Sequence, residues 1–250
     1  MLGSDALVRV PEIPMKAFIL LVPALVCSAQ EVGLAPQLAR AGSVSTDQLR
    51  ALQARLVLDP APAARKTYYE KYLEYQLATR VREKDPKAAR ALVERAIKSL
   101  EGSRDPECMA LLGAFLGLKI GFEPMSGMTL SPRAVGLFDE ALALAPASPR
   151  VRLLKATHIL HMPAFVGGGA KEALPLMEQA ARLAEQEKPS ADPWTPAWGK
   201  VESLSWLALT RFRAGQFEAA NQAADKALRV DPEYGFLVRV VIPEIRPKEL

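Results

Sequence analysis

The stretch VESLSWLALTRFRAGQFEAANQAADKALRVDPEY, residues 201–234, decides the fold of this chain. Its apolar residues recur every three or four positions over 199–213 and again over 217–230, which is the period of an amphipathic α-helix. Gly215 lies between the two segments and Pro232 follows the second, at places where helices end. The stretch is therefore predicted to form two helices joined by a tight turn. Its pattern is carried by Leu204, Leu207, Ala208, Gly215, Phe217, Ala220, Ala224, Ala227 and Pro232.

This pattern resembles the tetratricopeptide repeat (TPR), a 34-residue pair of antiparallel helices. That family places a large residue at position 4, leucine at 7, a small residue at 8, glycine near 15, an aromatic residue near 17, small residues at 20 and 27, and proline at 32. With Val201 as position 1, the stretch follows the pattern without a gap and departs from it at Arg211 and Ala224. The resemblance implies helix pairs whose first helices line the concave side of a superhelix.

Three weaker copies precede the last one, at 70–103, 106–148 and 149–187. Insertions lengthen the second and third copies, at Gly121–Leu130 and Met162–Val166, and residues 188–200 separate the third copy from the fourth. The prediction is an all-α chain, a right-handed superhelical stack of antiparallel helix pairs (a TPR-like α-solenoid) with capping helices. Its expected parts are N-terminal capping helices at 30–69, four repeats with insertions at 70–234, and a C-terminal cap or tail at 235–250.

Short capping sequences mark the expected helix starts, because an Asp or Ser side chain accepts hydrogen bonds from the first turn and proline suits the next position. They are Asp85-Pro86, Asp105-Pro106, Ser131-Pro132, Ser148-Pro149 and the possible capping box Ser45–Gln48. The predicted helices are 46–57, 62–83, 86–101, 106–120, 132–145, 149–161, 170–186, 199–213, 217–230 and 235–242.

The N-terminus is predicted to be an export signal with a spurious extension before it. A lysine follows Met15, Ala17–Val26 is an apolar run, and small residues suited to cleavage follow. Residues 1–29 are therefore expected to be a signal peptide whose true start is Met15, and the protein to be exported, either periplasmic or secreted. Two alternatives stay open: a buried N-terminal helix, and a lipoprotein acylated at Cys27. The valine before that cysteine disfavours the second, because bacterial lipid attachment requires a small residue there.

Charge and composition narrow the classes of partner. The 250 residues carry a net charge of +4, and the 24% that are charged alternate in sign along the predicted helices instead of forming a dense basic run. This disfavours nucleic acid as a partner. No apolar run after the leader is long enough to span a membrane. With Cys27 removed, only Cys108 remains, so no internal disulfide is expected.

Few residues offer catalytic or ligand chemistry. His158 and His161 are the only histidines, and no Cys, Asp or Glu lies at matching helical spacing, so a structural or groove-lining role is favoured over metal binding. No G-x-S-x-G motif is present. Gly167–Gly169 and the following Lys171 lack the spacing of a phosphate loop and predict a turn with positive φ, with an anion-holding concavity as the alternative. We therefore predict no enzyme activity, no metal and no cofactor.

Aromatic residues cluster in two places. Tyr68, Tyr72 and Tyr75 share one helix face, which favours core packing over lining a recognition groove. Trp194 and Trp198 lie in the proline-rich segment between the third and fourth repeats, and they are predicted to pack this segment onto the body, with a flanking ligand site as the alternative.

The TPR resemblance implies that repeat positions 2, 5, 9, 12 and 13 face the groove. These positions mix apolar residues with scattered Arg, Lys and Glu, which suits a protein or peptide segment. The candidate partner-binding residues are Lys71, Glu74, Arg82, Arg150, Leu153, Thr157, His161, Ser205, Leu209, Phe212 and Arg213. The predicted function is an exported, non-catalytic TPR-like scaffold that binds a protein or peptide partner in its concave groove; the oligomeric state stays open.

A second resemblance supports an alternative. The stretch His158–Ala181 holds Met162-Pro163, the three glycines and Lys171-Glu172-Ala173. It is similar to the helix–Pro–Gly-Gly–helix segment of the T component of tripartite TRAP transporters, periplasmic helical proteins with degenerate repeats thought to assist solute uptake. The alternative function is thus a periplasmic ligand-binding or accessory component of a TRAP-type solute transporter.

Overall fold

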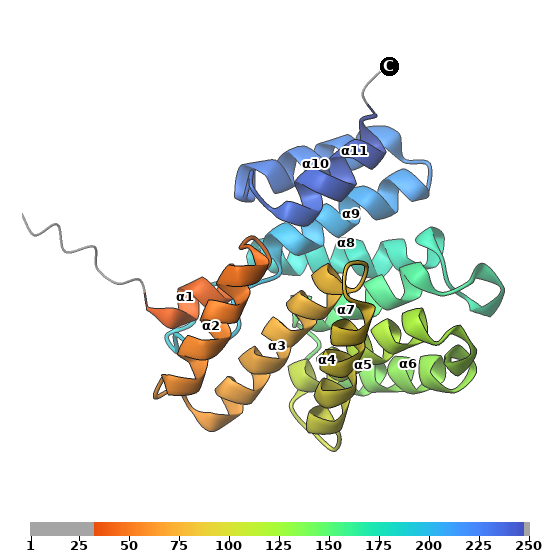
Figure 1. Cartoon of the computed structure of the whole chain (residues 1–250). Helices are drawn as coiled ribbons and strands as arrows, with labels where there is room; N and C mark the ends of the chain where they lie inside the picture. The colour runs from red at the N-terminus through yellow and green to blue at the C-terminus, as the bar shows by residue number, and fades with distance from the viewer. Residues whose placement is uncertain (1–32, 248–250) are drawn as a thin grey trace, which may run out of the picture. The chain divides into compact units, whose positions relative to one another are not determined.

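The structure, a computed structural model, describes residues 33–247, and its regular structure in that range is helical without any strand (Figure 1). This confirms the all-α prediction. The expected leader at 1–29, its start at Met15 and Cys27 lie outside the described residues. The α-helices are α1 (Leu34–Ala39), α2 (Thr46–Leu58), α3 (Ala63–Val81), α4 (Pro86–Leu100), α5 (Pro106–Phe122), α6 (Gly127–Leu144), α7 (Pro149–His161), α8 (Ala170–Gln186), α9 (Lys200–Arg213), α10 (Phe217–Val230) and α11 (Ile242–Ile245). Short 3-10 turns, Pro124–Ser126 and Ala164–Val166, precede α6 and α8, and a π-helical turn, Leu237–Val241, precedes α11.

Four of the five predicted helix starts are confirmed by their caps. The side chains of Ser45, Asp85, Asp105 and Ser148 each accept a hydrogen bond from a backbone N–H in the first turn of the helix that follows. At Ser45 the capping box is complete, since the Gln48 side chain accepts from the Ser45 N–H at 2.8 Å. Each such cap stabilises its helix by about 1 kcal/mol.

The start predicted at Ser131-Pro132 is wrong. Helix α6 begins at Gly127, directly after the 3-10 turn, and Pro132 lies inside it. The preceding 3-10 turn starts the helix in place of a capping side chain. Pro132 has no N–H to donate, and α6 tolerates the loss of this one backbone hydrogen bond near its N-terminal end. The sequence also misses α1, whose six residues are too few to show a helical period. The predicted helix 235–242 is helical in the structure, with a π-helical turn at Leu237–Val241 that continues into α11.

The helices pack as successive pairs, α3 with α4, α5 with α6, α7 with α8 and α9 with α10 (Figure 1). The first helix of each pair also contacts the first helix of the next, so that α3, α5, α7 and α9 form a continuous row. Small residues let the two helices of a pair approach each other closely. A Cβ on Gly113 of α5 would lie 2.8 Å from Cζ of the buried Phe138 of α6. None of the helices within 33–247 is both long and apolar enough to cross a membrane.

The loop between α1 and α2 joins the two ends of this row. Arg80 of α3 donates hydrogen bonds to the carbonyls of Ala41 and Gly42, at 3.0 and 2.6 Å. The Ser43 hydroxyl donates to Asp231 after α10, at 2.6 Å. The N-terminal segment therefore bridges the first and last helix pairs, and it covers part of the side formed by the row.

Candidate functional site

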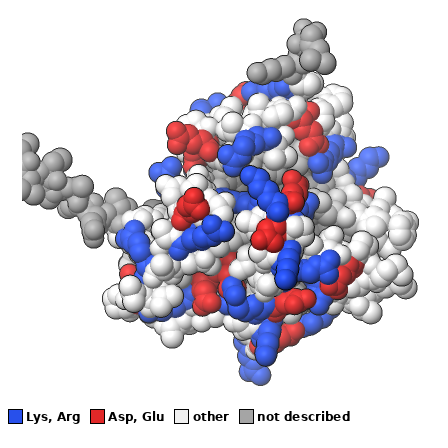
Figure 2. All heavy atoms as spheres, in the orientation of Figure 1, with Lys and Arg blue, Asp and Glu red and all other residues white. Residues whose placement is uncertain are grey.

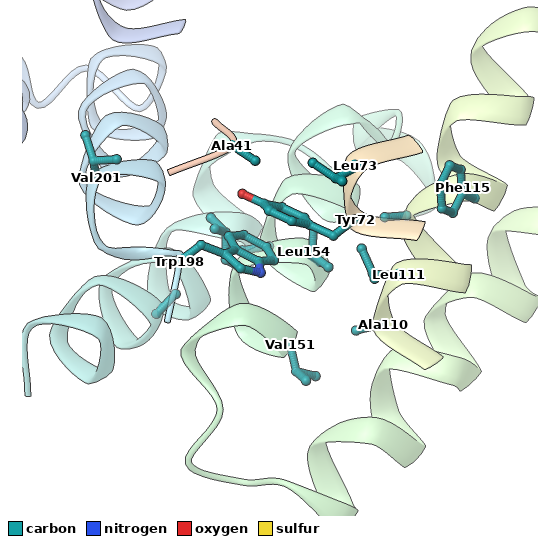
Figure 3. Packing of buried hydrophobic residues seen from close by; sticks show 14 of the residues in the cluster. Ala41, Tyr72, Leu73, Ala110, Leu111, Phe115, Val151, Leu154, Trp198 and Val201 are labelled. Carbon is teal, nitrogen blue, oxygen red and sulfur yellow. The ribbon is translucent and has the colours of Figure 1, made fainter. Parts of the chain in front are cut away.

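A segment of the chain itself fills much of the inner side of the helix row. Trp198, in residues 187–199, stacks on Tyr72 of α3 with ring centroids 4.5 Å apart and planes 13° apart (Figure 3). Its indole N–H donates to the Tyr68 hydroxyl at 2.7 Å, and Trp194 contacts the edge of Tyr69. These contacts confirm that the tyrosines and tryptophans pack as core. Burial raises the pKa of the Tyr68 and Tyr72 hydroxyls well above their ordinary value.

Arg150 of α7 holds this segment in place. Its guanidinium donates to both carboxylate oxygens of Glu107 at 2.8 and 2.9 Å, to both of Glu187 at 2.9 and 2.7 Å, and to the carbonyl of Trp198 at 2.9 Å. Burial disfavours the charged form of this group. The hydrogen bonds to Glu187 and the charge of Glu107 outweigh burial and raise the pKa of Arg150 above its ordinary value, so it stays charged.

Six of the eleven predicted groove residues are buried: Lys71, Glu74, Arg150, Leu153, Ser205 and Leu209. The Lys71 ammonium pairs with Glu74 at 3.1 Å, and Arg95 of α4 pairs with the same carboxylate at 2.8 Å. The Ser205 hydroxyl donates to the Val201 carbonyl of its own helix. In this structure these six side chains are not accessible to a binding partner. Their burial could not be predicted from the sequence, because the segments that cover them are remote in the chain.

The exposed part of the predicted groove lies at the C-terminal ends of the first helices. Arg82, His161 and Arg213 occupy the same repeat position in three different copies, and all three reach solvent. Thr157 and Phe212 are half-buried; the Thr157 hydroxyl donates to the Leu153 carbonyl, and Phe212 contacts Phe217.

Three residues that the sequence analysis did not single out complete this surface. Trp206 of α9 is half-buried between His161 and Phe236, at centroid distances of 5.6 and 4.4 Å. Arg239 lies three residues after Phe236, and its guanidinium packs so closely over Gly235 that a Cβ there would be 2.2 Å away. Trp206 lies two helical turns before Arg213 on the same face of α9. This spacing in the sequence could have identified Trp206 as a member of the surface. Nothing in the sequence places Phe236 and Arg239 there. We call these six residues the aromatic–arginine surface: Arg82, His161, Trp206, Arg213, Phe236 and Arg239.

The aromatic–arginine surface is positively charged. Arg213 pairs with Glu244 at 2.9 Å, whereas Arg82 and Arg239 have no ion-pair partner within 33–247. Partial burial lowers the pKa of His161, and the charges of Arg213 and Arg82 lower it further against the hydrogen bond to Thr157. Elsewhere acidic and basic side chains alternate over the face shown in Figure 2. The aromatic–arginine surface differs from the face in Figure 2 because it combines unpaired positive charge with aromatic rings.

The two histidines face different neighbours. The Nε2 atom of His158 lies 3.2 Å from the Ser131 hydroxyl of α6, and its Nδ1 atom packs against Gly117 of α5. A Ser–His pair therefore exists, but within 33–247 no carboxylate hydrogen-bonds to Nδ1 to orient the ring as in a hydrolytic triad. Burial lowers the pKa of His158 to about 4, with a smaller contribution from His161. Within 33–247, no three His, Cys, Asp or Glu side chains group as metal ligands.

The glycine run forms the predicted turn. Gly167 and Gly169 have φ of +83° and +106°, in the region that favours glycine, and α8 begins directly after them.

No family model matches the sequence, and no curated protein matches it. Among solved structures, the chain is similar to the HusA haemophore from Porphyromonas gingivalis, with a TM-score of 0.57 and 21% identity over 73% of this chain and 95% of that chain. At this identity the similarity establishes a shared helical fold and no more. The TPR resemblance therefore rests on the residue pattern and on the helix pairing described above.

Proposed function

We propose that this is an exported, non-catalytic binding protein that holds an acidic segment of a protein partner on the aromatic–arginine surface. The observation that carries the proposal is that Arg82 and Arg239, which have no ion-pair partner within 33–247, lie with Arg213 on one surface with a row of aromatic rings, while most charges near the inner side are paired. Trp and Arg are the residue types that contribute most to binding at protein interfaces. Unpaired arginines favour a carboxylate on the partner.

The covered inner side limits the length of that partner segment. Residues 187–199 contact the N-terminal halves of α3 and α7, and the loop between α1 and α2 contacts Arg80 in the last turn of α3, so a bound segment has only part of the C-terminal turns to contact. We therefore expect a short contact with few anchoring side chains, unlike a long extended peptide along the whole row. Export is proposed from the N-terminal signal pattern, with a periplasmic or secreted location.

Reversing two charges tests the site. We expect the Arg82→Glu/Arg213→Glu variant to recover the partner from an envelope extract at least tenfold less efficiently than the parent, because two attractive contacts become repulsive. Both side chains are exposed, so the helical circular dichroism signal should not change. The matched control is Arg50→Glu/Arg104→Glu, which reverses two exposed arginines away from the surface. Equal recovery by the parent and the Arg82/Arg213 variant would exclude the site.

A second candidate is a carrier of a small anionic ligand, and one observation favours it. His161 Nδ1 lies 2.8 Å from the Thr157 carbonyl, so that nitrogen donates and Nε2 is left free as a neutral acceptor. Such a nitrogen beside Trp206 and two arginines suits a flat ligand with carboxylates and a metal, and the structurally similar protein is named a haemophore. The TRAP-type alternative belongs to the same class. A haem titration separates the candidates: a Soret shift that His161→Ala abolishes would favour the carrier over the protein-binding role.

A further inference from the structure

Two neighbouring loop regions carry large apolar side chains that are more than half exposed. Met125 and Met128, where α5 gives way to α6, are 85% and 82% exposed. Phe165 and Val166, between α7 and α8, are 89% and 52% exposed. We call these four residues the apolar loop tips. Leaving such side chains in water is unfavourable, so a surface that covers them gains stability.

Both tips lie on the same edge of the described unit. The Ser131 hydroxyl of α6 and Nε2 of His158 in α7, 3.2 Å apart, join the two helices close to where the loops emerge. Figure 1 shows the two loops side by side, and the same edge in Figure 2 has few charged atoms. The sequence agrees, because 124–132 and 162–170 contain no Asp, Glu, Lys or Arg.

The backbone of the tips satisfies many of its hydrogen bonds internally. The Val166 and Gly168 N–H groups donate to the Pro163 carbonyl, and the Gly169 N–H donates to the Ile159 carbonyl at 2.9 Å. In the other loop, the Ser126 N–H and hydroxyl both donate to the Glu123 carbonyl. Backbone groups with internal partners can enter a poorly hydrated layer without losing hydrogen bonds to water.

The charges around the tips favour an anionic surface. Lys119 and Lys171 flank the two loops, and neither has an ion-pair partner within 33–247. Glu123 is neutralised by Arg90 at 3.2 Å. Glu172 at this rim is exposed and has no ion-pair partner in the described part of the chain, so the two lysines leave the rim with a small positive excess.

We propose that the protein docks on the surface of an anionic lipid bilayer through the apolar loop tips, with Lys119 and Lys171 at the headgroups. Four side chains that project singly would each need a fitted pocket in a folded protein partner, whereas acyl chains accept them without fitted pockets. The boundary between headgroups and acyl chains accepts segments that carry no charge and whose backbone hydrogen bonds are made internally. Both loops have these properties. This proposal is independent of the aromatic–arginine surface, because none of the four loop-tip residues belongs to that surface.

Vesicle sedimentation tests the proposal with residues 32–250, the compact unit that contains the whole described core. We expect the parent to bind mixed phosphatidylethanolamine–phosphatidylglycerol vesicles, and the Met125→Ser/Met128→Ser/Phe165→Ser variant to bind them about a thousandfold more weakly, since each of the three apolar side chains contributes about tenfold. Lys119→Gln/Lys171→Gln should weaken binding about tenfold on these vesicles and leave it unchanged on phosphatidylcholine.

The matched control is Val57→Ser/Leu58→Ser at the end of α2, where the two side chains are 74% and 87% exposed. This control should bind vesicles like the parent, and all variants should keep the parent's helical circular dichroism because the replaced side chains are exposed. Absence of vesicle binding by the parent would overturn the proposal. So would equal binding by the parent and the triple serine variant, or an equal loss in the α2 control.

Discussion

Replacing Arg150 with methionine is expected to lower the free energy of unfolding by about 3–5 kcal/mol. Arg150 is 4% exposed, and its guanidinium joins α5, the end of α8 and the 187–199 segment through Glu107, Glu187 and the Trp198 carbonyl. Methionine fills a similar volume but removes the arginine donor from two carboxylates and a carbonyl. Urea unfolding followed by circular dichroism measures the loss, and a red shift of tryptophan fluorescence would report release of Trp198.

Arg213→Met is the control for this prediction. Arg213 also pairs with a glutamate, at 2.9 Å, but both side chains are more than 30% exposed. We expect a change in the free energy of unfolding of less than about 1 kcal/mol. If Arg150→Met were equally mild, the 187–199 segment would not be held as described. The same contrast explains why the charge-reversal test uses Arg82 and Arg213 instead of Arg150, whose loss would reduce binding by unfolding the protein.

The second large effect is a pair of opposite pH dependences. Burial, with the charge of Asp231, raises the pKa of Glu202 to about 7, although hydrogen bonds from its own N–H and that of Gly199 lower it. The folded protein keeps this proton after the unfolded chain releases it, so the contribution of Glu202 to stability falls as pH rises from about 4.5 to 7. His158, with its pKa lowered to about 4, behaves oppositely: its contribution falls as pH drops from about 6.5 to 4.

Each contribution amounts to about 3 kcal/mol across its window, and in the parent the two offset each other. Single variants should separate them. Glu202→Gln keeps an oxygen for the Gly199 N–H, and its stability relative to the parent should increase by about 3 kcal/mol from pH 4.5 to 7. The stability of His158→Gln relative to the parent should fall by a similar amount over the same range. Urea unfolding at several pH values measures both, and parallel profiles for the parent and both variants would contradict the assignment.

Much of the helix framework could be predicted from the sequence because its signals are local. Capping side chains at Asp85, Asp105 and Ser148 contact backbone groups two or three residues away, so a short window contains the whole interaction. The same rule failed at Ser131 because the 3-10 turn before α6 had already begun the helix. A capping sequence does not show whether a helix has already begun at an earlier residue.

The candidate site was predictable only in part because it depends on remote contacts. The TPR-like register predicts equivalent positions for Arg82, His161 and Arg213, and in the structure the charges of Arg82 and Arg213 both act on His161. The register could not show that Trp198, 126 residues after Tyr72, would fill the rest of the inner side. Nor could it bring Phe236 against Trp206, because the π-helical turn after α10 departs from the repeat.

Photocrosslinking tests the central claim most directly, which is that a partner binds the aromatic–arginine surface. We would place benzoylphenylalanine at Phe236 and, as a control, at Leu58, which is 87% exposed and so more accessible. We predict crosslinks from Phe236 to an acidic segment of an envelope protein, lost in the Arg82→Glu/Arg213→Glu background and absent from Leu58. Crosslinks from Leu58 alone, or Phe236 crosslinks that persist after charge reversal, would contradict the claim.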